Sequence, residues 1–303
     1  MLLHEDKDLF KEVVISTAEE LELGVPIVEK DYYVTMILKQ LAEKCPDCVF
    51  KGGTSLSKCH HVIERFSEDV DISFSNKLTQ GMRKHLKNDT IAGISSELGM
   101  PIIDWEKARS RRDYNCYTFS YDPIVGYVTE GRLIPGVKME VSLASVSFPT
   151  LSLSVDSYVY QFLSKDNKEV VEEYHLQPFK MNVQGMDRTL ADKIFALCDY
   201  YLQGKTKRYS RHIYDIYMLL PKVPQNEDFK QLVCQVRKLR AEMSICPSAA
   251  EGVNIPALLK EIIDNEVYKE DYQDITTYFQ NHSLDYTEAI SALKTIAAGG
   301  MFE

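Results

Sequence analysis

The chain has 303 residues, 45% of them hydrophobic and 26% charged, a composition that can bury a substantial core in two domains or lobes. Its formal net charge of −10 at pH 7 excludes a protein that coats nucleic acid through many phosphate contacts, but it still allows one RNA end to dock in a local basic patch. No apolar run is as long as a membrane span, and residues 4–8 read His-Glu-Asp-Lys-Asp, unlike a signal sequence, so we expect a cytoplasmic protein without a membrane partner.

The N-terminal region has a helical pattern that ends in a cysteine motif. Residues 8–45 predict two or three helices, with a break at residues 24–26, which read Gly-Val-Pro. Residues 45–48 then read Cys-Pro-Asp-Cys, a single C-x-x-C motif in a chain of seven cysteines without disulfide-framework spacing. Because no second pair of cysteines completes a zinc site, we interpret this motif as a turn between helix and strand.

A glycine turn follows the first expected strand, 48–51. The strand ends at Gly52 and Gly53, after which Thr54 can cap a helix. Strand, glycine turn and helix start form a phosphate-binding arrangement, because glycines let the backbone approach phosphate oxygens. The hydroxyl of Thr54 or Ser55 would join the free N–H groups of the first helical turn as donors. Taken alone, the turn fits an ordinary strand-to-helix connection equally well.

Two aspartates occupy the next expected strand, 69–74. Apolar residues alternate there with Asp69, Asp71 and a serine, which is typical of a half-buried strand. Both carboxylates therefore leave the same face, with their backbones roughly 6 to 7 Å apart. Such a pair repels itself, so its usual purpose is to bind a cation. Together, the glycine turn and the two aspartates predict chemistry on a nucleoside triphosphate.

A third acidic residue, Glu140, lies on the polar face of an otherwise apolar strand expected at 137–145. A desolvated charge needs a partner, which can be Lys138 or an arginine elsewhere in the chain. The alternative partner is a metal pair that Glu140 shares with Asp69 and Asp71. Three carboxylates can hold two Mg²⁺ ions roughly 3.5 to 4 Å apart, and Glu140 could then help to accept the proton of an attacking hydroxyl.

Basic side chains are needed beside the leaving group of such a reaction. The candidates are Lys58, Arg65 and Lys193. Lys58 could reach the β- or γ-phosphate from the helix after the glycine turn, and the alternative is a solvated lysine on an exposed face. Arg211 and Asp215 lie four residues apart on an expected helix, where they would form a modest ion pair, and we expect a structural role for Asp215.

The remaining periodicity divides the chain into a part that contains the sheet and a helical part. We expect an α+β fold, in which an N-terminal lobe, 1–165, has a mixed β-sheet flanked by helices and a C-terminal lobe, 166–303, is a helical bundle. The further strands expected in the N-terminal lobe are 114–121 and 150–162, and its further helices are 54–65 and 78–98. The helices expected in the C-terminal lobe are 186–203, 209–221, 226–243, 255–264 and 285–297.

Four blocks of the sequence resemble the nucleotidyltransferase superfamily with a DNA polymerase β-like fold. Within it, they resemble the AbiEii/AbiGii toxin family of bacterial type IV toxin–antitoxin and phage-abortive systems. The resemblance implies that the N-terminal lobe is the nucleotidyltransferase lobe, that Asp69, Asp71 and Glu140 bind metal, and that Lys193 contacts phosphate. The four blocks are residues 28–34, 51–71, 137–142, and 190–197 together with 211–217. The nucleotide site expected from the residues and the resemblance comprises Gly52, Gly53, Thr54, Ser55, Lys58, Arg65, Lys193 and Arg211.

The resemblance implies an Mg²⁺-dependent nucleotidyltransferase that moves a nucleoside monophosphate from a triphosphate to an acceptor hydroxyl. It also implies a toxin with a cognate antitoxin, for which the acceptor would be the 3′ end of tRNA or another RNA. Basic patches at 107–112 and 205–211 could grip such an acceptor. Transfer to a protein hydroxyl, as nucleotidylation or phosphorylation, is an alternative, and so is a catalytically silent module that binds nucleotide or antitoxin.

Overall fold

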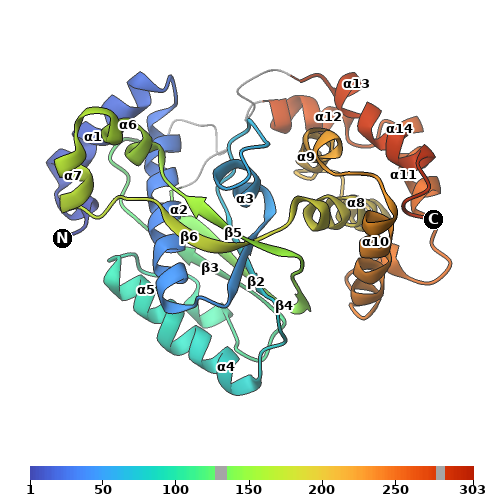
Figure 1. Ribbon diagram of the computed structural model, residues 1–303, viewed down its shortest axis with the longest axis horizontal. Helices are drawn as coiled ribbons and strands as arrows, with labels where there is room; N and C mark the ends of the chain where they lie inside the picture. Colours follow the sequence, from blue (N-terminus) through green and yellow to red (C-terminus); the bar gives the residue numbers. More distant parts are fainter. Residues whose placement is uncertain (127–134, 278–283) are drawn as a thin grey trace. The chain divides into compact units, whose positions relative to one another are not determined.

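The computed structural model describes residues 1–126, 135–277 and 284–303, and it divides the chain into two compact units (Figure 1). The first unit comprises residues 1–59 and 67–183, and the second comprises residues 60–66 and 184–303. The division between the units falls later in the chain than the boundary expected after residue 165. The reason is a strand at 179–184, which the sequence analysis did not include although its apolar and polar residues alternate, and which pairs with the sheet of the first unit.

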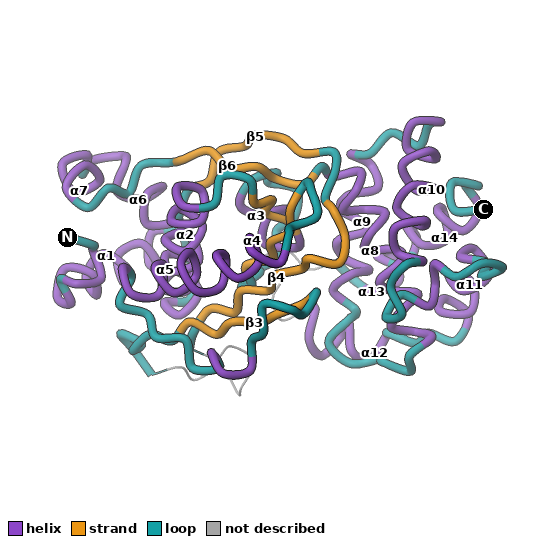
Figure 2. Tube along the Cα trace, turned by 90° about the horizontal axis from the view of Figure 1, so that it is seen from below, coloured by secondary structure: helices purple, strands orange, loops and turns teal. Residues whose placement is uncertain are grey.

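A mixed six-stranded sheet lies at the centre of the first unit, with the strand order β3-β4-β2-β1-β6-β5. Strand β1 pairs antiparallel with β2 and parallel with β6, while β4 pairs parallel with β2 and antiparallel with β3. Figure 2 shows these strands together with the helices around them. The expected α+β class with a mixed sheet is therefore confirmed. The strands are β1 (Cys48–Lys51), β2 (Val70–Phe74), β3 (Tyr114–Phe119), β4 (Val137–Val146), β5 (Thr150–Val155) and β6 (Phe179–Gln184).

Only the first half of the strand expected at 150–162 is present in the structure. Strand β5 ends at Val155, and the helix α6 (Tyr158–Asp166) begins soon afterwards. Ser157 caps this helix, because its hydroxyl accepts a hydrogen bond of 3.0 Å from the backbone N–H of Tyr160. Aromatic residues in this segment favour a strand by intrinsic preference, but the cap and the packing of the segment against α2 and α7 decide for a helix.

The helix α2 (Val25–Lys44) is buried along most of its length and packs against β4. It begins after Gly24 with a proline in its first turn, as the sequence predicts. Charged residues on a buried helix need partners, so the charged residues of α2 become important for the site. The other helices of the first unit are α1 (Lys7–Glu20), α3 (Gly52–Lys58), α4 (Gln80–His85), the π-helix Leu86–Ile91, α5 (Ala92–Glu97) and α7 (Lys168–Glu173).

The helix expected at 54–65 is much shorter in the structure. It starts two residues earlier, at Gly52, and ends at Lys58. Thr54 therefore lies inside α3 and does not cap it, which corrects that expectation. His61, with a positive φ of 51°, lies beyond the helix.

The second unit is built on the helix α8 (Met186–Leu202), which contacts α9, α10 and α11. The five helices expected in this part of the chain are present within a few residues, although the last one is divided at Ile290. In the described part of the chain, no helix is both long enough and apolar enough to span a membrane. The other helices are α9 (Arg211–Leu219), α10 (Glu227–Ala241), α11 (Ile255–Asp264), α12 (Lys269–Asp271), the π-helix Tyr272–Thr276, α13 (Tyr286–Ala289) and α14 (Ser291–Ala298).

Candidate functional site

A row of polar residues crosses the sheet of the first unit. The strand register places Lys51 beside Asp71, Asp71 beside Glu140, and Glu140 beside Cys116. Residues directly opposite each other on neighbouring strands project from the same face of a sheet. Asp71 and Glu140 are therefore neighbours on one face, although 69 positions of sequence separate them. Asp69 lies two residues before Asp71 and just outside β2.

The backbone of Gly52 approaches the Asp71 carboxylate closely. Gly52 has a φ of +78°, in the region that favours glycine, and a Cβ atom at this position would lie 2.1 Å from Asp71 Oδ2. No other residue fits this position without displacing the carboxylate. The glycine turn and the acidic row, which the sequence places apart, thus form one local site in the first unit.

The hydroxyl groups of the glycine turn have partners within the protein. Thr54 Oγ1 donates to the carbonyl oxygen of Asp69 at 2.6 Å and lies 2.9 Å from the hydroxyl of Ser67. Ser55 Oγ donates to the carbonyl oxygen of Gly52 at 2.9 Å. These contacts join α3 to the segment that enters β2, and they give both hydroxyls a structural role that the sequence did not indicate.

Tyr114 is a neighbour of Glu140 that sequence reasoning missed. Its side chain is 49% exposed and forms a hydrogen bond with Glu140. Burial raises the pKa of Tyr114, and the charges of Glu140 and Asp71 raise it further. Burial and the charge of Glu140 likewise raise the pKa of Cys116 to about 11. Alternation along β3 puts Tyr114 and Cys116 on one face, so their position could have been found once this strand was paired with β4.

Lys58 forms a buried ion pair in the first unit. Its Nζ lies 2.5 Å from Asp31 Oδ1 and 2.9 Å from the carbonyl oxygen of Asp156. Asp31 Oδ2 also accepts a hydrogen bond of 2.9 Å from the N–H of Tyr158. Burial raises the pKa of Asp31, and the charge of Lys58 opposes this shift. The pair joins α2, α3 and α6, so Lys58 is not the solvated lysine that the sequence allowed.

Asp215 is held by two cations in the second unit. Arg65 Nε lies 2.7 Å from Asp215 Oδ1, and Arg65 Nη2 lies 2.7 Å from Oδ2. Lys193 Nζ lies 2.6 Å from the same Oδ2. Burial alone would raise the pKa of Asp215, but Arg65 and Lys193 more than offset that effect and hold it far below its usual value. The structural role expected for Asp215 thus depends on residues distant in sequence.

The structure also locates three other polar residues of the second unit, His60, Asp192 and Arg211. His60 Nε2 lies 2.9 Å from the carbonyl oxygen of Gln184, outside the helix in which the sequence placed it. Asp192 accepts hydrogen bonds from Arg188 at 3.0 Å and from Arg240 at 3.3 Å, so it joins α8 to α10 and is not a simple surface carboxylate. Arg211 is the exposed first residue of α9.

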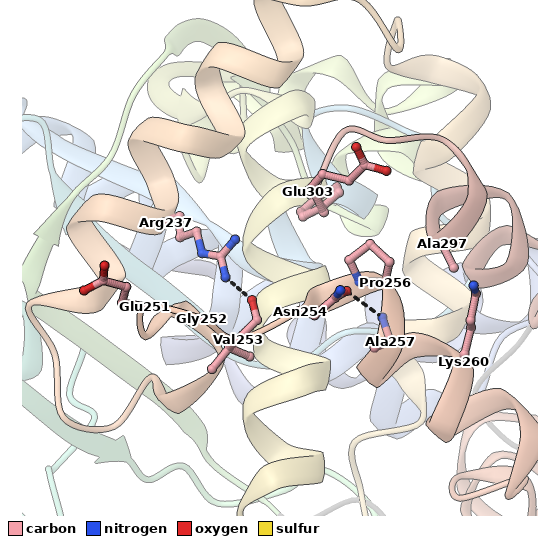
Figure 3. Close-up of a pocket in the computed structure, with 11 residues that line it drawn as sticks. Arg237, Glu251, Gly252, Val253, Asn254, Pro256, Ala257, Lys260, Ala297 and Glu303 are labelled. Atoms are coloured by element: carbon pink, nitrogen blue, oxygen red, sulfur yellow. Dashed lines mark hydrogen bonds between the residues drawn. The ribbon is translucent and has the colours of Figure 1, made fainter.

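A separate cavity of about 700 Å³ lies in the second unit, beside α10, α11 and the C-terminal residues (Figure 3). Arg237 points to its wall and donates to the carbonyl oxygen of Val253, and Asn254 accepts a hydrogen bond of 2.9 Å from the N–H of Ala257. None of the site residues expected from the sequence lines this cavity. It is therefore separate from the acidic row and from Asp215.

The residues of the acidic row have the chemistry of a magnesium site without a preformed cluster. Within residues 1–126, 135–277 and 284–303, no three histidine, cysteine, aspartate or glutamate side chains are gathered closely enough to hold a metal ion. Asp71 and Glu140 nevertheless come from adjacent strands, and carboxylate oxygens are the donors that Mg²⁺ prefers. The donor set present fits a hard cation.

A mixed sheet that sets two carboxylates on adjacent strands beside a glycine turn is the arrangement expected from the resemblance to nucleotidyltransferases. The family model of the nucleotidyl transferase AbiEii toxin of type IV toxin–antitoxin systems matches residues 37–293, and the chain belongs to this family. It is therefore a nucleotidyltransferase toxin.

Comparison with solved structures supports the fold. MenT4, a nucleotidyltransferase toxin from Mycobacterium tuberculosis H37Rv, is similar with a TM-score of 0.59 at 15% sequence identity. The similarity covers 94% of this chain and 88% of the MenT4 chain. A comparison with curated proteins gave no match.

Replacing Gly52 with alanine tests the close approach to Asp71. We expect Gly52→Ala to lower the free energy of unfolding by about 2–4 kcal/mol, because a positive φ and a steric clash act together. Displacement of the carboxylate should lower the rate of pyrophosphate release roughly 100-fold. Urea denaturation and a pyrophosphate-release assay measure the two effects.

Gly99→Ala is the matched control, because Gly99 has a φ of +60° but open space around its Cβ position. It should lose about 1 kcal/mol of stability from backbone strain and keep its activity. Equal rates of pyrophosphate release by the two variants would show that the close approach of Gly52 to Asp71 does not affect activity.

Removing the charge of Asp215 should strongly destabilise the protein. Asp215→Asn leaves Arg65 and Lys193 buried without their carboxylate, so we expect a loss of about 3–5 kcal/mol at pH 7. The lowered pKa of Asp215 gives the wild type stability that is fully present above about pH 4 and is lost as the pH falls through the folded pKa. The difference between the two proteins should therefore shrink below about pH 4.

Urea denaturation at pH 7, 5 and 3 measures this difference. Asp113→Asn is a suitable control, because Asp113 is 64% exposed and pairs with Arg83 on the surface, where about 0–1 kcal/mol is expected. A gap between wild type and Asp215→Asn that is the same at all three pH values would contradict the assigned ion pair.

Proposed function

We propose that this toxin transfers a nucleoside monophosphate from a nucleoside triphosphate to an RNA hydroxyl, in particular the 3′ end of tRNA, and releases pyrophosphate. A cognate antitoxin would control it in the cytoplasm. The observation that carries the proposal is the pairing of Asp71 with Glu140 beside the backbone of Gly52. This arrangement would bring carboxylates for a metal next to a glycine turn whose backbone N–H groups could meet phosphate.

Asp69, Asp71 and Glu140 are the residues that would hold magnesium. The strand pairing sets Asp71 beside Glu140, and two adjacent carboxylates are most stable when a cation neutralises them. Two bound Mg²⁺ ions would activate the attacking hydroxyl and neutralise the leaving pyrophosphate. Glu140 would also accept the proton of the acceptor hydroxyl, and its hydrogen bond with Tyr114 orients it for this task.

The triphosphate would approach the backbone at Gly52 and Gly53. Because Thr54 and Ser55 donate their hydroxyls to backbone oxygens, the turn would offer backbone N–H groups and not hydroxyl groups. Phosphate contact by Lys58, Arg65, Lys193 and Arg211 is likewise a proposal. An ammonium group has three donors, and the contact of Lys193 with Asp215 occupies one of them, which leaves two that could bind phosphate.

An exposed basic loop supports RNA as the acceptor. Lys205, Lys207 and Arg208 are exposed, and two tyrosines of the same segment, Tyr200 and Tyr209, stack with ring centroids 3.7 Å apart. Cations interleaved with aromatic rings suit single-stranded nucleic acid, because phosphates bind the cations and bases stack on the rings. On a chain of net charge −10, this loop is a local attraction for an RNA end.

The loop is also held in a fixed conformation within the second unit. Asp271 is buried, and its carboxylate accepts hydrogen bonds from the N–H of Arg208 at 2.6 Å and from the N–H of Ser210 at 3.0 Å. In the other basic patch, by contrast, Arg109 and Arg112 donate to nearby backbone oxygens of their own loop. We therefore favour the loop at 205–208 as the contact for RNA.

Labelling of total tRNA tests the proposed reaction. With Mg²⁺ and each α-³²P nucleoside triphosphate in turn, the wild type should label tRNA, and Asp71→Asn should lower labelling at least ~100-fold because the metal site is opened. Asp166→Asn, a change of an exposed residue at the end of α6, should label like the wild type. Label on a protein instead of RNA would favour the alternative acceptor, and transfer of γ-label alone would contradict nucleotidyl transfer.

Neutralising the basic loop should weaken RNA binding without altering the fold. The triple variant Lys205→Ala, Lys207→Ala, Arg208→Ala should bind tRNA more weakly. The slope of the logarithm of its binding constant against the logarithm of the salt concentration should be less steep by about 0.7 for each single-strand phosphate that the loop no longer neutralises. Fluorescence anisotropy over a salt series measures this slope.

A triple variant of the other patch, Lys107→Ala, Arg111→Ala, Arg112→Ala, changes the net charge by the same amount and serves as the control. If both triple variants weaken tRNA binding equally, the effect comes from overall charge and the loop at 205–208 is not the RNA-binding surface.

A further inference from the structure

The Cys-Pro-Asp-Cys motif forms a turn in which two cysteines meet. Cys45 directly follows α2 and Cys48 opens β1, and the N–H of Cys48 donates to the carbonyl oxygen of Cys45 at 2.9 Å. Such a bond closes a β-turn, whose first and fourth Cα atoms lie less than about 7 Å apart. A disulfide requires Cα atoms about 4.4–6.8 Å apart. The backbone therefore already has the spacing of a disulfide while both thiols are free.

The two thiols differ in access. Cys45 is half-buried and lines a cavity of about 360 Å³ together with apolar side chains such as Leu78 and Met82. Cys48 is 1% exposed and lies beside Phe74 in the sheet. A small reagent can thus reach the Cys45 sulfur through the cavity, whereas the buried Cys48 sulfur reacts with the neighbouring Cys45 sulfur.

The thiols also interact with each other. A hydrogen bond from the Cys48 thiol lowers the pKa of Cys45, while the same bond and burial raise the pKa of Cys48. The thiolate is the reactive form of cysteine in exchange with disulfides. This asymmetry gives the accessible thiol the role of the attacking group and the buried thiol the role of the resolving group.

We propose that Cys45 and Cys48 form a dithiol that small disulfides, such as glutathione disulfide, oxidise to an intramolecular disulfide. The Cys45 thiolate attacks one sulfur of the reagent, which forms a mixed disulfide and releases one thiolate. The Cys48 sulfur, after losing its proton, attacks the Cys45 sulfur and releases the second thiolate. Two cysteine thiols are oxidised, one disulfide reagent is reduced to two thiols, and the two protons end on the released sulfurs.

The motif lies where two supporting elements of the acidic row meet. The helix α2 carries Asp31, the partner of Lys58 on α3, and the strand β1 leads to Lys51, which pairs with Asp71. A disulfide between Cys45 and Cys48 would tie the end of this helix to the start of this strand. The proposed disulfide would therefore lie next to the elements that position the row.

The other cysteines provide internal controls. Burial raises the pKa of Cys59 to about 12 and that of Cys246 to about 11, so these thiols should react slowly. Cys234 is exposed on α10, and no other cysteine occurs within four residues of it in the sequence. It can form a mixed disulfide with glutathione but has no local cysteine to resolve it.

Peptide mapping after oxidation tests the proposal on the full chain. Fully reduced protein is incubated with glutathione disulfide, quenched with iodoacetamide at increasing times and analysed by mass spectrometry. In the wild type, the peptide with Cys45 and Cys48 should lose two hydrogens and carry no glutathione, while Cys234 should carry a glutathione adduct. Cys48→Ala should trap the glutathione adduct on Cys45, and Cys45→Ala should leave Cys48 unreacted.

The wild-type measurement is decisive even if a variant fails to fold, which circular dichroism would reveal. Alkylated Cys45 and Cys48 in protein whose Cys234 has reacted would overturn the proposal. A stable glutathione adduct on Cys45 of the wild type would overturn it as well, because Cys48 would then not act as the resolving thiol. The assay uses neither nucleotide nor RNA, so its outcome is independent of the proposed transferase reaction.

Discussion

The register between β1, β2 and β4 is the constraint on which the site of the first unit depends. Side chains alternate between the two faces of a sheet, so a slip of one residue would turn Asp71 away from Glu140 and from Gly52. Burial fixes this register, since Val70, Ile72, Met139 and Val141 lie on the opposite face and are at most 1% exposed. Each such side chain contributes about 1.5–3 kcal/mol when it is buried.

This apolar contribution exceeds the repulsion that it must overcome. Two carboxylates about 5 Å apart repel by about 3 kcal/mol at an effective dielectric constant of 20. Four buried apolar side chains together provide about 6–12 kcal/mol, so the sheet can hold Asp71 beside Glu140. The positions of the side chains in the acidic row are therefore set by the apolar core of the sheet.

Local pattern in the sequence was enough to predict the strands of the acidic row, most helices and the α+β class. It failed where the deciding contact is distant in the chain. Arg65 and Asp215, for example, are 150 residues apart. The strand β6, which moves the division between the units beyond residue 165, is a different case, because its apolar residues Phe179, Met181 and Val183 do alternate with polar ones and the pattern was overlooked. The helix expected at 54–65 was too long because the segment after Lys58 belongs to the second unit. The hydrogen bond between Tyr114 and Glu140 required a strand pairing that no local pattern contains.

Lys58 and Lys193 are both buried, but the charge balance of their ion pairs differs. Lys58 and Asp31 form a neutral pair, so their burial leaves no net charge. In the second unit, Arg65 and Lys193 share the single carboxylate of Asp215, and these three side chains together keep one positive charge. The first ion pair joins α2 to α3 and its glycine turn, whereas the second joins Arg65 and α8 to α9.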